Sequence, residues 1–167
     1  RLNEWLEDRK QNFNRKMANV VTVSPGTGTI GVVALDKEGR LAAGTSTGGK
    51  GFEKIGRVSD SAMPAGNYAT DSAAVSCTGI GEDIIDECLA AKIVIRVTDG
   101  FSIKAAFERS FAEAHEHKRD LGAIGIDAGG TINWGKTCDV ILAAFHDGEK
   151  IGDSLEADKG KSTFSVE

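Results

Sequence analysis

The sequence predicts a mixed α/β fold in which short strands and helices alternate. An apolar, β-branched stretch over residues 30–35 runs into a turn at 36–39 and returns as a second strand over 41–46. A helix with apolar residues at helical spacing begins near Glu82. Another helix begins after Ser102, a residue that favours the position just before a helix. With 167 residues, the chain has the length of a single domain.

The N-terminal elements follow from local patterns. Residues 1–21 carry apolar side chains at helical spacing, so a helix is expected there. Residues 24–28, Ser-Pro-Gly-Thr-Gly, interrupt regular structure, and we expect an exposed linker that can be cut. The strand over 30–35 is almost wholly apolar, which indicates that both of its faces are covered.

The later elements are predicted in the same way. Residues 48–72 are rich in loops, and a strand of small residues follows over 73–77. The helix from Glu82 is expected to point Ile84, Ile85, Cys88 and Leu89 inward, and Asp83, Asp86 and Glu87 outward. Residues 93–97 fit a strand or a helix, and the helix after Ser102 ends around 115–117. Strands over 121–126 and 131–134 flank the hairpin signal Asp127-Ala128-Gly129-Gly130; a last strand covers 140–145, and a polar, frayed tail begins near Asp153.

Composition excludes several classes of function. The net charge of -5 gives no electrostatic reason to expect nucleic acid or a membrane surface as a partner. No apolar run is long enough to cross a bilayer, and the charged start does not resemble a secretory signal. Three cysteines without a C-x-x-C pair indicate reduced thiols in a cytoplasmic protein. His115 and His117 are two residues apart and do not share a helix face, and His146 is remote in sequence, so no metal site is expected. No cofactor is expected either, because a threonine activated by its own α-amine needs none.

Candidate chemistry lies where hydroxyl residues and glycines meet at strand ends. Three such clusters occur: Gly28-Thr29, the run 45–49 (Thr-Ser-Thr-Gly-Gly), and the run 78–81 (Thr-Gly-Ile-Gly). Backbone N–H groups at the third cluster, between a strand and a helix, can hold an anion. If the Gly28–Thr29 bond is cut, the new α-amine of Thr29 can act as the base for its own hydroxyl. Arg57 and Asp60 carry the two charges needed to hold the carboxylate and ammonium of an amino acid.

Each of these features also has a purely structural interpretation. Arg57 and Asp60 fit a surface ion pair, and Thr47 fits an ordinary hydroxyl at a strand end. Cys77 lies beside Thr78 without a histidine nearby in sequence, which favours a buried structural cysteine over a thiol nucleophile.

Three stretches together resemble the β subunit of plant-type L-asparaginases, also called isoaspartyl peptidases, which are N-terminal-nucleophile hydrolases. The first is residues 28–49, GTIGVVALDKEGRLAAGTSTGG. The second and third are 56–61, GRVSDS, and 76–82, SCTGIGE, in the order and spacing of that family. The resemblance covers about residues 28–150.

The resemblance implies a fold, a reaction and a set of site residues. The fold is an αββα sandwich, of which this chain supplies about half. The precursor cuts itself between Gly28 and Thr29, and Thr29 then attacks asparagine or a β-aspartyl dipeptide. Thr47 tunes the nucleophile, while Thr78 and Gly79 form the oxyanion site. The substrate-binding residues lie in two runs: Arg57, Val58, Ser59 and Asp60, and Thr78, Gly79, Ile80 and Gly81.

Relatives in that family carry well over a hundred residues before the nucleophile, whereas only 28 precede Thr29 here. We therefore expect residues 1–28 to be an α-subunit tail and processing linker, 29–152 a catalytic β-subunit-like domain, and 153–167 the tail. The remaining α region is expected to be a separate chain, to have been lost, or to belong to a longer precursor of which this chain is a piece. The resemblance implies an (αβ)2 assembly. An uncut chain would be a zymogen. Residues 133–137, Asn-Trp-Gly-Lys-Thr, depart from the Asn-Thr-containing stretch of many relatives.

Two alternatives to this function are compatible with the sequence. Glycosylasparaginases share the threonine chemistry but accept an amide that bears a glycan. Such enzymes typically have an aspartate before the nucleophile, where this chain has Gly28. The other alternative is an unprocessed homologue without catalysis that serves as an oligomerisation or binding module.

Overall fold

The computed structural model describes residues 28–49, 54–138, 141–154 and 163–166, the last range by its backbone alone. The helix expected over 1–21 and most of the linker before Thr29 lie outside these ranges. None of the helices in the described part has the length and hydropathy needed to span a bilayer.

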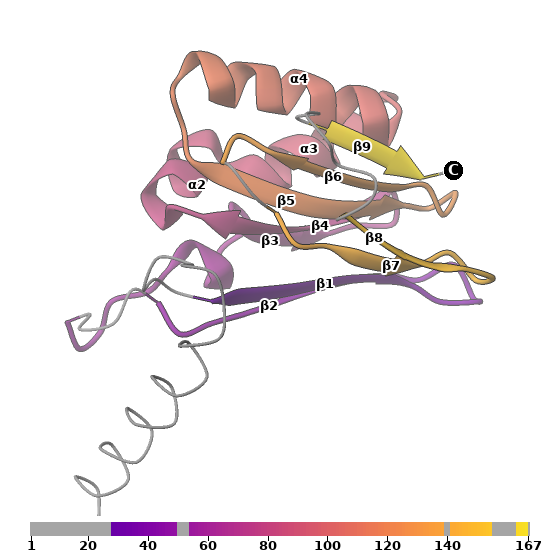
Figure 1. Cartoon of the computed structure of the whole chain (residues 1–167), viewed down its shortest axis with the longest axis horizontal. Helices are drawn as coiled ribbons and strands as arrows, with labels where there is room; N and C mark the ends of the chain where they lie inside the picture. The colour runs from indigo at the N-terminus through magenta and orange to yellow at the C-terminus, as the bar shows by residue number, and fades with distance from the viewer. Residues whose placement is uncertain (1–27, 50–53, 139–140, 155–162, 167) are drawn as a thin grey trace, which may run out of the picture.

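Three antiparallel sheets and one layer of helices make up the described part of the structure (Figure 1). The strands β1 (Thr29–Leu35) and β2 (Leu41–Thr47) form a hairpin. A five-stranded sheet has the order β3 (Asn67–Ala69), β4 (Ala73–Gly79), β5 (Leu121–Asp127), β6 (Ile132–Lys136) and β9 (Thr163–Val166). The helices are α2 (Gly81–Glu87), α3 (Leu89–Thr98) and α4 (Ile103–Glu116). Strands β7 (Ala144–His146) and β8 (Ile151–Asp153) form a second hairpin.

The hydrophobic core lies between the five-stranded sheet and the helices. Five consecutive small or apolar residues of β4, 73–77, are buried, so this strand is covered on both sides. The stacked rings of Phe107 and Phe111, 5.8 Å apart, belong to α4 and are buried. On its other face β4 contacts the hairpin β1–β2. The sheet is therefore the middle layer of the molecule, and its strand β4 carries residues toward both neighbours.

The hairpin β1–β2 matches the sequence prediction in position but not in burial. Exposure alternates along β1, and Ile30 and Val32 are 72% and 59% exposed, so the prediction that both faces are covered is wrong for the described structure. The reason is geometric: one face of a two-stranded sheet rests on β4 and β5, and no described layer lies on the other face.

The helix near Glu82 also differs from its prediction. Cys88 adopts a left-handed backbone (φ 48°), which ends α2 and begins α3 in a new phase. Ile84 and Leu89 are buried as predicted, whereas Cys88 is exposed, Ile85 is 38% exposed and Glu87 is buried. A prediction that assumes one unbroken helix assigns the wrong buried face to the residues around this break. Residues 93–97, which fitted a strand or a helix, are helical in α3.

The C-terminal strands differ from their prediction in two places. Of the strand expected over 140–145, residue 140 lies outside the described residues, 141–143 are not in a strand, and 144 and 145 belong to β7, which extends to His146. Within the tail that was expected to fray, Thr163–Val166 pairs with β6 as an edge strand. Alternating polar and β-favouring residues, Thr-Phe-Ser-Val, suit such an edge, because β6 offers a free row of backbone hydrogen-bonding groups.

Ion pairs connect the three helices, and Glu113 of α4 lies among them. Arg96 donates to both Glu113 carboxylate oxygens at 2.6 and 2.8 Å, and Lys92 lies 3.3 Å away. Burial raises the pKa of Glu113, but the hydrogen bonds and charges of Arg96 and Lys92 outweigh this and lower the pKa to about 2. Because the pKa is lowered in the folded state, the stabilisation is present above the ordinary value of 4.5 and is lost as the pH falls toward 2.

We therefore expect Glu113→Gln to lower the melting temperature of the full-length protein at pH 7 and to have progressively less effect toward pH 3. Thermal unfolding of both proteins between pH 7 and pH 3 measures this difference. Glu116→Gln, on an exposed position of the same helix, is the control and should leave the melting temperature nearly unchanged. A Glu113→Gln effect of constant size across this pH range would contradict the assignment.

Candidate active site

The pairing of β1 with β2 brings two threonine hydroxyls together. Thr29, the first residue of β1, lies opposite Thr47, the last residue of β2. The Thr29 Oγ1 donates a hydrogen bond to Thr47 Oγ1 at 3.2 Å, and Thr47 Oγ1 also accepts the backbone N–H of Gly49 at 3.1 Å. Thr29 is half-buried, while Gly28 before it is exposed and has open space around its Cα. The peptide bond before Thr29 thus lies at the surface, at the end of an ordered strand.

The end of β4 is a constrained turn into α2. Gly79 has φ +127°, and a Cβ at this position would lie 2.5 Å from the carbonyl oxygen of Asp120. The next residue, Ile80, donates its backbone N–H to the same oxygen at 2.9 Å. Only glycine fits both the backbone angle and the space. The turn from Thr78 to Gly81 is therefore held by the residue that precedes β5.

Asp60 begins a short 3₁₀ helix, Asp60–Ala62, and its carboxyl group is buried beside α2. Asp60 is 7% exposed, and a Cβ on Gly81 would lie 2.7 Å from its Oδ1 and 3.5 Å from Arg57 Nη2. Burial raises the pKa of Asp60, although backbone hydrogen bonds and the positive charge of Arg57 oppose the change. Arg57 itself is 3.3 Å from Glu82. A further positive charge beside this buried carboxyl group, such as a ligand's ammonium group, would favour its ionised form.

These elements line one cavity of about 220 Å³. Eight of its ten lining residues are among those predicted from sequence: Thr29, Thr47, Arg57, Asp60, Thr78, Gly79, Ile80 and Gly81. The structure does not bring Val58 or Ser59 into the cavity wall; Val58 is 59% exposed, and Ser59 caps the 3₁₀ helix by accepting the N–H of Ser61.

Two lining residues, Gly49 and Asp120, were not predicted from the sequence. Gly49 belongs to the glycine pair that follows Thr47, so the hydroxyl-glycine pattern contained a signal for it. Asp120 reaches the cavity because β5 pairs with β4, with Leu121 opposite Gly79. The two paired residues, Gly79 and Leu121, are more than forty residues apart in the chain, so no local sequence pattern predicts that Asp120 lies beside the turn.

The other candidate groups lie elsewhere. Cys77 is 1% exposed, and burial raises the pKa of its thiol well above the ordinary value, which disfavours the reactive thiolate. His117 contacts Glu87 in the ion-pair network of the helices. In the described ranges, no group of three or more His, Cys, Asp or Glu residues could hold a metal ion.

The cavity combines a hydroxyl pair, a glycine turn and two opposite charges. The guanidinium of Arg57 suits a carboxylate, and the carboxyl group of Asp60 suits an ammonium group. Thr29 supplies a hydroxyl whose bond to Thr47 fixes its direction. A small zwitterion with an acyl group on its side chain matches this set of contacts.

Comparison with known proteins gives one family. The model of a family described as asparaginase matches residues 1–156. The chain is 69% identical to an isoaspartyl peptidase/L-asparaginase of Nostoc sp., over 99% of this chain and 54% of the relative. It is 59% identical to a protein of the same name from Synechocystis sp., over 96% of the chain and 50% of the relative. A plant-type L-asparaginase of Pyrococcus abyssi is 35% identical over 86% of the chain and 48% of the relative.

The chain thus spans about half the length of the curated relatives it matches. The family match covers both the hairpin that carries Thr29 and the turn that carries Gly79. These matches show that the chain belongs to the asparaginase family.

Proposed function

We propose that this chain is the nucleophile-bearing part of an amidohydrolase that cuts itself between Gly28 and Thr29. The mature enzyme then cleaves L-asparagine, β-aspartyl dipeptides or both, and releases aspartate. One observation carries the proposal: the Thr29–Thr47 hydroxyl pair, Arg57 and Asp60 all line the same cavity. The names of the Nostoc and Synechocystis relatives, isoaspartyl peptidase/L-asparaginase, agree with it.

The proposed reaction begins with the α-amine that self-cleavage creates on Thr29. This amine takes the proton from Thr29 Oγ1, and the oxygen attacks the side-chain carbonyl carbon of the substrate. A free α-amine has a pKa of about 7.7–8.0, which suits a base near neutral pH. The carbonyl oxygen becomes an oxyanion, which Thr78 and Gly79 stabilise; one such donor contributes about 3–4 kcal/mol.

The intermediate collapses when its C–N bond breaks. The proton held by the amine passes to the leaving nitrogen, which departs as ammonia or as the α-amine of the second residue of a dipeptide. The aspartyl group then remains as an ester on Thr29. Water attacks that ester after the same amine takes one of its protons. The bond between the acyl carbon and Thr29 Oγ1 then breaks, the amine returns the proton to Oγ1, and aspartate is released. Throughout, Arg57 and Asp60 hold the α-carboxylate and the α-ammonium of the aspartyl group.

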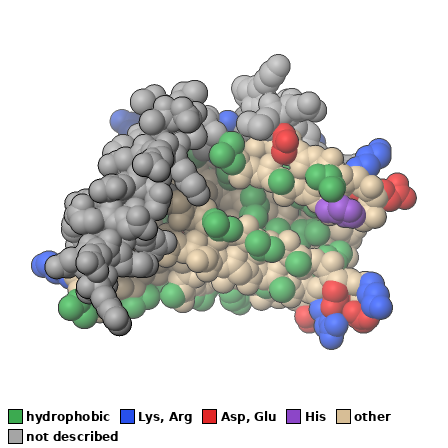
Figure 2. Space-filling view, turned by 60° about the horizontal axis from the view of Figure 1, so that its bottom comes forward, with side chains coloured by type: hydrophobic (Ala, Val, Ile, Leu, Met, Phe, Trp, Pro, Cys, Tyr) green, Lys and Arg blue, Asp and Glu red, His purple; other side chains and the backbone are tan. Residues whose placement is uncertain are grey.

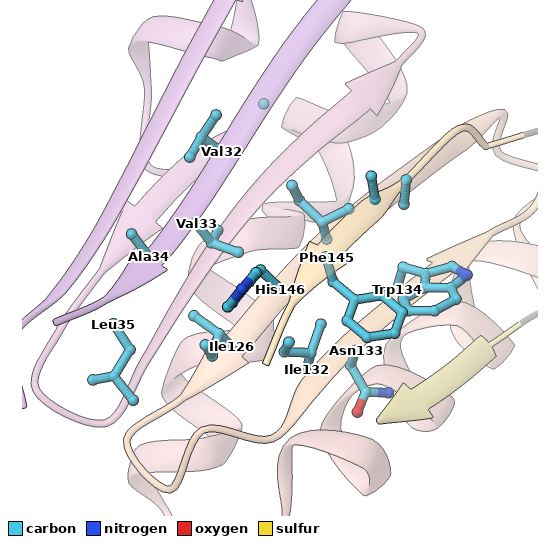
Figure 3. Close-up of a pocket in the computed structure, with 14 residues that line it drawn as sticks. Val32, Val33, Ala34, Leu35, Ile126, Ile132, Asn133, Trp134, Phe145 and His146 are labelled. Atoms are coloured by element: carbon cyan, nitrogen blue, oxygen red, sulfur yellow. The ribbon is translucent and has the colours of Figure 1, made fainter. Parts of the chain in front are cut away.

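A second, larger cavity supports a proposal about the rest of the protein. It has a volume of about 330 Å³ and lies between β1 and the strands β5, β6 and β7. Figure 3 shows side chains of β1, including Val33 and Leu35, on one side of it and Ile126, Trp134 and Phe145 on the other. Hydrophobic side chains surround a hollow on this face of the molecule (Figure 2). Among the described strands, β1 pairs with β2 alone, so its other edge is open beside this cavity.

We propose that the α region fills this side, completes an αββα sandwich, and assembles as (αβ)2. An open strand edge and an apolar cavity are unfavourable in water. A strand of the α region that pairs with the open edge of β1 would satisfy its backbone groups, and apolar side chains of the same region would fill the cavity. The relatives are about twice as long as this chain, which leaves enough residues for such a region. In this arrangement residues 1–28 are the α-region tail and linker, and residues 29–152 carry the catalytic groups.

The test is to purify the full-length protein and measure its intact mass, N-terminal sequences and activity. We expect two fragments that co-elute under non-denaturing conditions, one of them beginning Thr-Ile-Gly-Val. We also expect release of ammonia from asparagine or hydrolysis of a β-aspartyl dipeptide. A single uncut, inactive species would support a non-catalytic homologue instead. Fragments that separate without denaturant would contradict the proposed assembly.

Arg57→Ala should raise the KM of the full-length enzyme by about 10- to 100-fold, because a charge-assisted hydrogen bond to the substrate is lost. The kcat should change much less, since the proposed contact is made equally in the ground state and the transition state. Steady-state kinetics with asparagine measure both constants. Arg40→Ala, which removes exposed ion pairs to Asp36 and Glu38 in the β1–β2 turn, is the matched control and should leave both constants unchanged. An unchanged KM in Arg57→Ala would exclude this role.

A further inference from the structure

Behind the cavity, a pair of hydroxyl groups joins the hairpin β1–β2 to the five-stranded sheet. Thr45 Oγ1 of β2 and Ser76 Oγ of β4 are 2.7 Å apart. Ser76 is 2% exposed, and its Oγ also lies 3.5 Å from the backbone carbonyl oxygen of Gly44. The site chemistry described above uses neither hydroxyl, although a buried hydrogen bond of this kind fixes two strands in one relative position.

Gly31 makes this approach of the sheets possible. It lies opposite Thr45 in the hairpin, and a Cβ on Gly31 would overlap Ser76 Oγ and lie 3.0 Å from Ser76 Cβ. With glycine there, the backbone of β1 passes directly beneath the Ser76 side chain. Gly31, Thr45 and Ser76 thus form one contact between the layers, which we call the hydroxyl clamp.

The clamp is one step along the strands from the residues of the site. Gly31 follows Thr29 by two residues in β1, and Thr45 precedes Thr47 by two residues in β2. Ser76 likewise precedes Thr78 by two residues in β4. Side chains two residues apart lie on the same face of a strand, about 7 Å from one another. Each member of the clamp therefore lies on the same face of its strand as the site threonine next to it.

We propose that the hydroxyl clamp sets the distance between the nucleophile on the hairpin and the oxyanion turn at the end of β4. Thr45 and Ser76 are positioning residues, and the inference rests on the proposed function of Thr29. Thr29 and Thr47 belong to one sheet, whereas Thr78 and Gly79 belong to the other, so their spacing depends on how the two sheets are held together. An error of about 1 Å in such a spacing lowers a rate by about 10²-fold.

The experiment compares Thr45→Val with Thr45→Ser in the full-length protein. Valine keeps the shape of threonine but removes the hydroxyl, while serine keeps the hydroxyl and removes a methyl group. Ser46→Ala is the matched control, because Ser46 is the next residue of β2 and lies on the opposite, exposed face. The measurements are kcat and KM of the processed enzyme, the rate of self-cleavage, which uses the same Thr29 oxygen, and the melting temperature.

We expect Thr45→Val to lower kcat and the self-cleavage rate by about 10- to 100-fold, with KM changed less than about threefold, because Arg57 and Asp60 do not belong to the clamp. Thr45→Ser and Ser46→Ala should stay close to the unchanged protein. The double variant Thr45→Val/Ser76→Ala should lose no more than the larger single loss, since both changes remove the same hydrogen bond.

The inference would be overturned by a Thr45→Val enzyme with unchanged kcat, by equal losses in the valine and serine variants, or by losses that multiply in the double variant. A kcat loss in Ser46→Ala as large as in Thr45→Val would do the same. The Thr29→Ala variant distinguishes an error in the clamp proposal from an error in the proposed function. If Thr29→Ala is inactive while Thr45→Val is fully active, the function stands and the clamp does not. If Thr29→Ala keeps its activity, the proposed function itself is wrong.

Discussion

Thr29→Ala is expected to abolish both self-cleavage and turnover in the full-length protein. Alanine has no oxygen to attack the bond before residue 29 or the substrate carbonyl, so both reactions lose their nucleophile. Loss of the nucleophile lowers kcat by about 10⁴-fold or more in hydrolases that form a covalent intermediate. Gel electrophoresis should show a single uncut chain, and ammonia release from asparagine should fall to the background rate.

Thr29→Ser is the matched control for this variant. It retains a hydroxyl and the α-amine after cleavage, so partial self-cleavage and partial turnover are expected. Both variants should melt near the temperature of the unchanged protein, because Thr29 is half-buried and contributes one hydroxyl contact, to Thr47. Measurable cleavage at Gly28–Thr29 in Thr29→Ala would remove this residue from the mechanism.

Gly79→Ala is expected to have the second-largest effect, a loss of about 10²- to 10³-fold in kcat. An alanine Cβ would lie 2.5 Å from the carbonyl oxygen of Asp120, and the backbone angle of +127° is unfavourable for any residue with a Cβ. The turn must therefore move away from β5, and the proposed oxyanion donors move with it. Because the contact is with backbone atoms, no side-chain rotation can relieve it.

Gly39→Ala separates the effect of the backbone angle from the effect of the clash. Gly39 also has a positive φ, +80°, but a Cβ there would meet no atom within 4 Å. Gly39→Ala should cost about 1 kcal/mol or more of stability and leave kcat unchanged. Steady-state kinetics and urea unfolding of both variants measure the two effects. A Gly79→Ala enzyme with full kcat would show that this turn does not hold the oxyanion.

Local sequence patterns predicted most of the elements in the described ranges. The β1–β2 hairpin, β4, the cap of α4 at Ser102 and the β5–β6 hairpin lie where turn residues and alternation placed them. These features depend on residues within a few positions of one another. The errors have another origin. The left-handed Cys88 separates α2 from α3, and β9 needs the edge of β6 as a partner.

The residues of the candidate site also fall into those that local sequence predicted and those that it did not. Sequence patterns pointed to the hydroxyl-glycine clusters and to the charges of Arg57 and Asp60, because their chemistry is local. The sequence did not predict Asp120 as part of the cavity wall, or Ser76 as part of the contact that supports the site. Each reaches its place through pairing of β4 with β5 or packing of β4 on the hairpin.

By itself, the sequence determined the chemical groups: a threonine after a glycine, a glycine turn before a helix, and two opposite charges on one loop. Only the tertiary structure decided which of these groups share a cavity, which face of β1 is covered, and how the two sheets are spaced. The physical reason is that residue types and local spacing select strands, turns and reactive groups. The distances between layers follow from contacts among residues far apart in the chain, such as the hydrogen bond of Ser76 to Thr45.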